Sequence, residues 1–293
     1  MKRAFFNNYP DRIPYTEVVS KEARSLLQRV TNRLKAGENP TLLLCFPELP
    51  GSKTTLFKIA AHLGINLTNK PGAKAQIAIY FENKTLRTHD EEMMELLHQM
   101  KVINLFSRDI SKDKVDADFV AVFGYSTQIN PKEHQGPALE KSLENARHDG
   151  RTIQCPTDSV HADCIYQRII DNSCGLNEVV DIRVPIIGKS IPHVYSKYKL
   201  EEHRYTNKVH RSTMHEASEL FSAEELLKIH QFAVLSKLDF GELDILRDTN
   251  DGKIYIVDVN NTPYGPPQGL SAKDNRQAIQ NLSRSFKNEF LKQ

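Results

Sequence analysis

The sequence lacks paired cysteines of the kind that build metal or redox sites. Its four cysteines, Cys45, Cys155, Cys164 and Cys174, form no C-x-x-C motif. A chain of 293 residues can bury a full hydrophobic core without disulfide bonds. We therefore expect four reduced thiols and a cytoplasmic protein.

Long hydrophobic runs are missing as well. The segment 1–19 contains no apolar run long enough for a signal peptide, and no later stretch approaches the roughly 20 residues that a membrane-spanning helix needs. Internal repeats and low-complexity segments are also absent. We expect a globular protein that is not bound to a membrane.

Neither sign of charge dominates. The chain has 39 Lys and Arg against 37 Asp and Glu, a formal net charge of +2. Proteins that hold phosphate backbones through a salt-sensitive grip carry a much larger basic excess. We therefore expect a small-molecule substrate and no nucleic-acid partner, and we leave a homodimer open.

The N-terminal third alternates strand and helix signals. Continuous apolar runs of five to seven residues are typical of buried strands, and apolar residues at spacings of three and four are typical of helices. Ser52 is a plausible cap for the helix that ends before Gly64. The expected elements are helices at 16–35, 53–63 and 90–101 and strands at 41–46, 75–81 and 102–106. Together they predict an α/β layer.

The remaining two thirds of the chain do not show this alternation of strand and helix signals. Residues 107–166 are polar and irregular, which suggests a small separate subdomain. Beyond them, 179–187 and 192–199 predict two antiparallel strands joined through Gly188. Ser222 with Glu225 forms a capping box that opens a helix, and Ser271 with Asp274 is expected to open the last helix.

The most informative segment is 239–267, where two β-rich runs flank Asn250-Asp251-Gly252. This tripeptide predicts a hairpin turn. With a three-residue turn, Asp244 lies opposite Asp258, and Asn260 follows on the same face. Such oxygen ligands suit Mg²⁺. The alternative is a solvated face on which each aspartate lies near a basic residue.

Strand, turn, strand and then Asp258-Val259-Asn260 resembles the end of an ATP-grasp domain of the glutathione synthetase type, whose second strand typically reads Glu-x-Asn. About two thirds of the chain follows the order of that superfamily. The resemblance implies an α/β (α+β) fold with an N-terminal pre-ATP-grasp domain (1–106), a lid subdomain (107–165) and an antiparallel C-terminal core (166–293). It also implies that ATP and Mg²⁺ are cofactors and that Asp244, Asp258 and Asn260 bind the metal.

The same resemblance assigns further site residues. Lys112, with Lys114 as the reserve, and Lys141 would contact the nucleotide phosphates, together with Arg147 or His148 in a loop that is poor in glycine. Arg183 would stabilise the transferred group, making Arg183 and Lys141 the catalytic candidates. Gln167, Arg168 and Ile169 would form the hinge that contacts the adenine. Asp171 would contact the ribose, with Asn172 as the second candidate. Asp171 and Asn172 also fit an ordinary turn.

The resemblance implies a ligase that joins a carboxylate to an amine or similar nucleophile through an acyl phosphate. A kinase on the same fold that phosphorylates a hydroxyl is the first alternative. A nucleotide-binding protein without turnover is the second, because the shorter acid at Asp258 and the glycine-poor loop depart from the usual pattern. The sequence does not indicate the substrates.

Two other patterns are set aside. Residues 50–56 (PGSKTTL) lack the glycine spacing of a P-loop, and we interpret them as the start of a helix. The histidines at 193, 203, 210 and 215 have no zinc-ligand spacing with cysteine, and we expect them at the surface.

Overall fold

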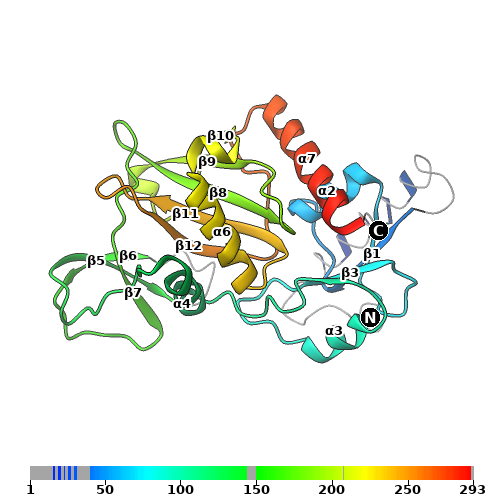
Figure 1. The fold of residues 1–293 in the computed structure, drawn as a ribbon, viewed down its shortest axis with the longest axis horizontal. Helices are drawn as coiled ribbons and strands as arrows, with labels where there is room; N and C mark the ends of the chain where they lie inside the picture. Colours follow the sequence, from blue (N-terminus) through cyan, green and yellow to red (C-terminus); the bar gives the residue numbers. More distant parts are fainter. Residues whose placement is uncertain are drawn as a thin grey trace.

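The computed structural model describes residues 40–143, 150–206 and 208–291, together with eight positions between 16 and 31. Those eight positions are helical, as the sequence predicts for 16–35. Arg147, His148 and Asn207 lie outside the described residues. Figure 1 shows three sheets side by side: a three-stranded sheet at one end, a five-stranded sheet in the middle, and a four-stranded sheet at the other end.

The N-terminal sheet is parallel, with strand order β2-β1-β3-β4. Its central strands are continuous apolar runs because helices and chain segments cover both of their faces. The strands are β1 (Leu42–Pro47), β2 (Asn66–Thr68), β3 (Ile77–Phe81) and β4 (Val102–Ile103), connected in part by helices α2 (Thr55–Leu63) and α3 (Asp90–Leu97).

Helix α2 begins two residues later than Ser52 would place it. Its N-cap is Thr54, which has extended backbone angles and whose hydroxyl accepts a 3.3 Å hydrogen bond from the Phe57 amide. Gly64 ends the helix at a positive φ of 71°, as expected. The predicted cap at Ser52 is therefore wrong, because the chain between Ser52 and Thr54 still turns toward the helix.

The apolar run 102–106 was expected to be one strand, but β4 stops at Ile103. Asn104 has a φ of 58°, which turns the chain away from the sheet. Its side-chain oxygen accepts hydrogen bonds from the amides of Asp239 (2.9 Å) and Phe240 (2.8 Å). The fully buried Asn104 thus fixes the start of β11 (Phe240–Arg247) against the N-terminal sheet.

The middle segment contains a helix that the sequence analysis did not predict. Helix α4 (Lys112–Phe123) is capped by Ser111, and its buried Val115, Phe119 and Phe123 repeat every four residues. The helix packs on β12 (Ile254–Asn260) of the C-terminal sheet. Strands β5 (Gly136–Ser142), β6 (Arg151–Cys155) and β7 (Cys164–Arg168) then form the antiparallel sheet β6-β5-β7.

The C-terminal sheet is antiparallel, in the order β10-β9-β8-β11-β12. The predicted hairpin is confirmed by the pairing of β8 (Glu178–Ile187) with β9 (Val194–Leu200). Both predicted helix starts are confirmed as well, with a complete capping box at Ser222 and Glu225. The other elements are η2 (Glu201–His203), β10 (Arg211–His215), α5 (Ala217–Leu220), α6 (Ala223–Leu235), α7 (Ala272–Phe286) and η3 (Lys287–Leu291).

Helices cover the C-terminal sheet unevenly. Helices α4 and α6 pack against one face and form its main apolar core. Helix α7 instead reaches α2, where Leu282 and Phe286 join the core of the N-terminal sheet. The three sheets follow the order of the three expected domains, but the boundaries at residues 106 and 165 stay predictions.

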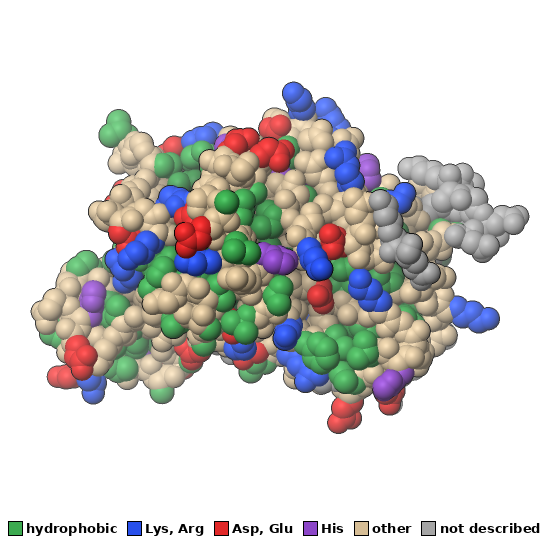
Figure 2. Space-filling model, viewed as in Figure 1, with side chains coloured by type: hydrophobic (Ala, Val, Ile, Leu, Met, Phe, Trp, Pro, Cys, Tyr) green, Lys and Arg blue, Asp and Glu red, His purple; other side chains and the backbone are tan. Residues whose placement is uncertain are grey.

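Two other expectations concern the surface and the thiols. On the face drawn in Figure 2, Lys and Arg side chains alternate with Asp and Glu and form no continuous basic surface. All four cysteines are free thiols. Among the described residues, no helix has both the length and the apolar character needed to span a bilayer.

Candidate functional site

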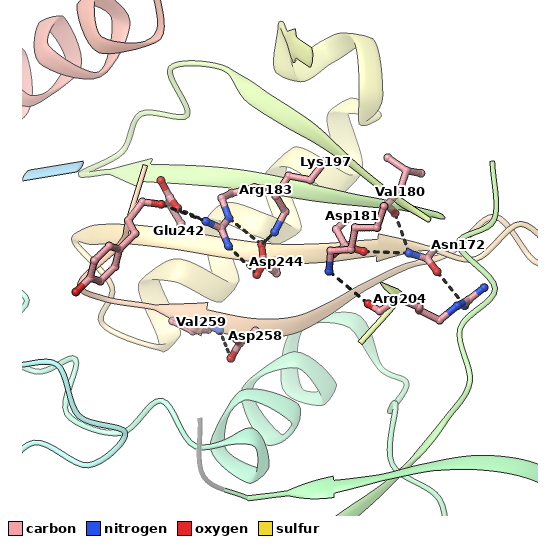
Figure 3. Close-up of polar contacts among 12 residues, drawn as sticks. Asn172, Val180, Asp181, Arg183, Lys197, Arg204, Glu242, Asp244, Asp258 and Val259 are labelled. Carbon is pink, nitrogen blue, oxygen red and sulfur yellow. Dashed lines mark hydrogen bonds and ion pairs between the residues drawn. The ribbon is translucent and has the colours of Figure 1, made fainter. Parts of the chain in front are cut away.

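The face of the five-stranded sheet opposite α4 and α6 carries a dense group of charged side chains (Figure 3). Successive residues of a strand point to opposite faces. Ile182 and Val184 of β8 belong to the core beneath α4 and α6, so Arg183 between them lies on the opposite face. Arg183 therefore points away from this apolar core, toward the charged face.

Residues from four neighbouring strands form one row across this face. Tyr195 of β9 pairs with Arg183 of β8, Arg183 pairs with Asp244 of β11, and Asp244 pairs with Asp258 of β12. Side chains that are directly opposite in this way lie about 5 Å apart at Cβ. The row therefore brings an aromatic hydroxyl, a guanidinium and two carboxylates together.

The predicted opposition of Asp244 and Asp258 is confirmed, but it arises in another way. The loop between the two strands has six residues, 248–253, because Arg247 pairs with Ile254. A β-bulge then shifts the register between Asp244 and Ile245, leaving Val257 as the extra residue. The bulge restores the pairing that a three-residue turn would have given.

Arg183 and Lys197 both bind Asp244. The guanidinium makes two parallel hydrogen bonds to the carboxylate, Nε to Oδ1 at 3.0 Å and Nη2 to Oδ2 at 3.1 Å. Lys197 Nζ donates to Oδ1 at 2.8 Å. Burial acts to raise the pKa of Asp244, but these two cations outweigh it and hold that pKa well below its usual range.

Asp258 is in the opposite electrostatic situation. Burial and the neighbouring Asp244 carboxylate raise the pKa of Asp258 to about 6. Its Oδ1 accepts a hydrogen bond from the adjacent Val259 amide, at 3.2 Å. A carboxylate that has too little positive charge around it is a natural ligand for an added cation.

Asn260 and Glu242 complete the oxygen donors on this face. They pair with each other across β11 and β12, one position beyond the aspartates on the same face. Asn260 Oδ1 accepts from the Thr262 amide at 3.1 Å, and Glu242 Oε2 lies 3.2 Å from Arg183 Nη1. Glu242 was not predicted as a site residue, although its spacing of two from Asp244 in Gly-Glu-Leu-Asp places it on the same face.

These donors suit Mg²⁺, which prefers carboxylate and amide oxygens. Among the residues that the structure describes, no three His, Cys, Asp or Glu side chains already converge as a metal cluster. Asp244 instead forms ion pairs with Arg183 and Lys197. This agrees with the alternative in which each aspartate lies near a basic residue, except that the face is half-buried rather than solvated. The roles of Asp244, Asp258 and Asn260 as metal ligands stay predictions.

The two predicted phosphate-binding lysines approach the same face from other elements. Lys112 is the first residue of α4, and Lys141 lies on β5. The positive charges of both act on Asp258 and oppose the rise in its pKa. The reserve candidate Lys114 instead forms an ion pair with Asp118 on α4, so the geometry favours Lys112.

The predicted adenine hinge lies where β7 ends. The Gln167 side chain is buried and donates to Thr127 Oγ1 at 2.6 Å, and the Arg168 amide donates to the Thr127 carbonyl at 2.8 Å. Arg168 also donates from Nη1 to the Tyr255 hydroxyl at 3.1 Å. Of the three hinge residues, Ile169 alone makes no backbone hydrogen bond to another described residue. Its backbone is therefore the best placed of the three to form hydrogen bonds with the edge of the adenine.

Asp171 and Asn172 form the turn that follows the hinge. Asp171 Oδ1 accepts from both the amide and the hydroxyl of Ser173, at 3.1 and 2.6 Å. Asn172 is buried and bonds Asp181 and Arg204, at 3.1 and 3.0 Å. The structure therefore supports the turn interpretation, and the ribose contact of Asp171 stays a prediction.

A second group of polar contacts anchors this turn to the sheet, and Figure 3 shows its Asn172, Asp181 and Arg204. Lys199 Nζ lies 2.6 Å from Asp181 Oδ2. Through Asn172, the pair connects to Arg204, which also donates to the Ile170 carbonyl at 3.1 Å. Asp181 thus neutralises Lys199, and Arg204 fixes the end of the hinge.

The raised pKa of Asp258 predicts a pH-dependent effect of Asp258→Asn on the stability of the free protein. The folded-state pKa of about 6 exceeds the unfolded value of 3.8, so wild-type stability falls as pH rises through this window. The variant cannot ionise, so its stability relative to wild type should rise between about pH 4 and pH 6, the range between the two pKa values. Urea unfolding in the presence of a chelator measures this difference.

Asp251→Asn is the matched control for that series. Asp251 lies in the loop of the same hairpin, and its pKa is lowered, chiefly by the hydrogen bond from the Lys253 amide. The effect of Asp251→Asn on the free energy of unfolding should not vary over the same pH range. A flat pH profile for Asp258→Asn would contradict the electrostatic account of Asp258.

Comparisons with known proteins give a clear answer for the fold. No family model and no curated protein matches the sequence. Among solved structures, the chain resembles the VanG D-Ala:D-Ser ligase from Enterococcus faecalis, with a TM-score of 0.55, 10% identity, and 86% of this chain and 99% of that chain covered. The ATP-grasp ligase PsnB, complexed with a precursor variant, Mg and ADP, gives a TM-score of 0.52 at 12% identity, covering 86% and 99%.

A third structure agrees. A RimK domain ATP-grasp protein from Sphaerobacter thermophilus gives a TM-score of 0.50 at 9% identity, covering 87% of this chain and 100% of that one. Likeness at such low identity establishes a shared architecture and leaves the chemistry to be argued from the residues themselves.

Proposed function

We propose, from the premise that the chain has the ATP-grasp fold, that it is an ATP- and Mg²⁺-dependent ligase. It would join a carboxylate to an amine or similar nucleophile through an acyl phosphate. One observation carries the proposal: Lys112 of α4 and Lys141 of β5 act on the same carboxylate, Asp258, that faces Asp244 across the hairpin. Three separate parts of the fold thus direct these charged groups to one place, which supports the proposal that they bind phosphate and metal.

Each residue has a role that follows from its chemistry. Lys112 and Lys141 would neutralise nucleotide phosphates, and His148 lies in the loop expected to cover them. Asp244, Asp258 and Asn260 would hold Mg²⁺, with Glu242 as a neighbouring donor. When bound, Mg²⁺ would neutralise charge on the phosphate oxygens.

Arg183 would stabilise charge on the transferred group. It is held from two sides, by Asp244 and Glu242, which fixes the direction of its guanidinium. A group whose position is fixed before the reaction stabilises developing charge without reorganising. The hinge at Gln167, Arg168 and Ile169, followed by Asp171, would place the adenosine so that the phosphates reach this arginine.

The setting we propose is a cytoplasmic enzyme with a small-molecule substrate. The free thiols and the mixed surface charge of the described residues fit that setting. The ATP that the reaction consumes is abundant there as well.

Isotope transfer tests the reaction type. Carboxylates labelled with ¹⁸O are incubated in groups with Mg-ATP, the enzyme and a mixture of amines, and phosphate is analysed by ³¹P NMR. A ligase that forms an acyl phosphate moves one ¹⁸O atom into inorganic phosphate and releases ADP. A phosphorylated product without ¹⁸O-labelled phosphate would identify a kinase instead, and Mg-ATP binding without ADP release would identify a non-catalytic nucleotide-binding protein.

A further inference from the structure

Four buried polar atoms at the inner end of the site have no hydrogen-bond partner among the described residues. Two are the ring nitrogens of His193, and the other two are Tyr195 Oη and Glu242 Oε2, in side chains with exposed fractions of 0% and 2%. Leaving a buried polar atom unpaired costs about 1–3 kcal/mol. Native structures contain few such atoms, and a ligand group can supply the missing partner.

The Tyr195 and Glu242 side chains are close neighbours of Arg183. Tyr195 is directly opposite Arg183 on β9, and the charges of both Arg183 and Glu242 act on its phenol. Glu242 lies opposite Pro185, whose short side chain fills little space above the sheet. Tyr195 and Glu242 therefore border the guanidinium that we assign to the transferred group.

Other elements enclose this position. Thr55, at the start of α2, contacts Glu242 Oε1 at 3.4 Å. A Cβ atom at Gly265 would lie 2.9 Å from Glu242 Oε1 and 2.7 Å from Thr55 Oγ1, so the loop 261–267 passes close above the carboxyl group. His193, expected at the surface, is buried and packs edge-on against Tyr195, with ring centroids 4.6 Å apart.

The charge around Glu242 limits what can bind there. Arg183 Nη1 lies 3.2 Å from Oε2, and Lys58 is a second positive charge in its vicinity. These cations offset part of the carboxylate charge, but burial outweighs them and raises the pKa of Glu242. What its Oε2 atom lacks among the described residues is a hydrogen-bond donor.

A neutral hydroxyl satisfies both of the unpaired oxygen atoms at once. Its oxygen accepts from the Tyr195 phenol, and its proton is donated to Glu242 Oε2. An ammonium group cannot accept the first bond, and a carboxylate cannot donate the second. We propose that Tyr195 and Glu242 bind a hydroxyl group of the acceptor substrate beside Arg183. This inference rests on the proposed function and names the substrate class for the same site.

The first test needs no substrate. Tyr195→Phe removes an unpaired oxygen, so the free protein should melt at the same temperature as wild type or higher. Tyr80→Phe is the matched control, because Tyr80 is equally buried but its hydroxyl accepts from the His89 amide at 2.7 Å. Tyr80→Phe should lower the melting temperature. An equal loss in Tyr195→Phe would overturn the inference, since its hydroxyl would then have a partner in the free protein.

The second test uses pairs of compounds that differ by one hydroxyl: serine and alanine, threonine and 2-aminobutyrate, lactate and propionate, malate and succinate. With Mg-ATP and a mixture of donor carboxylates present, the hydroxylated member of at least one pair should raise ADP release at least about tenfold over its partner. Tyr195→Phe and Glu242→Gln should each reduce that ratio toward one. Tyr198→Phe is the control, because it is the same change on the same strand but Tyr198 pairs with Arg211 rather than with Arg183. It should leave the ratio of ADP release unchanged.

The outcomes separate the two proposals. Absence of Mg-ATP-dependent thermal stabilisation in wild type would refute the proposed function. If Mg-ATP stabilises the protein but no hydroxylated compound raises ADP release, or the ratio survives in both Tyr195→Phe and Glu242→Gln, the inference about the hydroxyl is wrong.

Discussion

Replacing Arg183 with methionine should destabilise the protein by about 3–5 kcal/mol, because the change leaves a buried ion network without its central cation. Glu242, with an exposed fraction of 2%, would lose the guanidinium 3.2 Å from its Oε2, and among the described residues Asp244 would keep its ion pair with Lys197. Urea unfolding at neutral pH measures this loss. If Arg183 also stabilises the transferred group, kcat should fall about 100- to 1,000-fold in the folded fraction.

Two comparisons make this prediction specific. Arg211→Met removes an exposed arginine that pairs with Glu178, and exposed pairs contribute about 1 kcal/mol or less. The destabilisation by Arg183→Met should shrink as pH falls, since burial already raises the pKa of Glu242 and protonation removes its unpaired charge. A loss no larger than that of Arg211→Met would show that the network does not depend on Arg183.

Replacing Lys141 with methionine should weaken Mg-ATP binding about 10- to 100-fold, as expected for the loss of a hydrogen bond to a charged phosphate. The variant should also raise the pKa of Asp258 further, because Lys141 opposes that rise. Isothermal titration calorimetry measures the affinity, and the pH profile of stability reports the change in pKa.

Lys114→Met is the control for that experiment. Lys114 lies two residues from Lys112 on α4, but it is exposed and paired with Asp118. Lys112→Met should resemble Lys141→Met, and Lys114→Met should resemble wild type. Equal affinities in Lys141→Met and Lys114→Met would remove Lys141 from the phosphate site.

The features that could be predicted from sequence are those with a short-range signal. Alternation around Arg183 fixes which face of β8 it occupies, and the capping box at Ser222 and Glu225 marks a helix start within four residues. The opposition of Asp244 and Asp258 was also predicted, although a bulge produces it rather than a three-residue turn. Local patterns therefore located the central row of the site.

The features that escaped prediction depend on partners far away in the chain. Lys197 reaches Asp244 and donates a hydrogen bond to it because β9 pairs with β8 and β8 pairs with β11. The burial of His193 likewise follows from packing that its own sequence neighbourhood does not encode. Helix α4 had a local signal in Ser111 and the four-residue spacing of Val115 and Phe119, which the polar residues around them obscured.

The central claim is that the face bearing Asp244 and Asp258 is a Mg-nucleotide site. Its most direct test is thermal unfolding of wild type and Asp258→Ala with ATP, with Mg²⁺, and with both. The account predicts that Mg-ATP raises the melting temperature of wild type, that ATP or Mg²⁺ alone does so far less, and that Asp258→Ala remains folded but loses the Mg-ATP effect. Equal stabilisation of both proteins by Mg-ATP would contradict it.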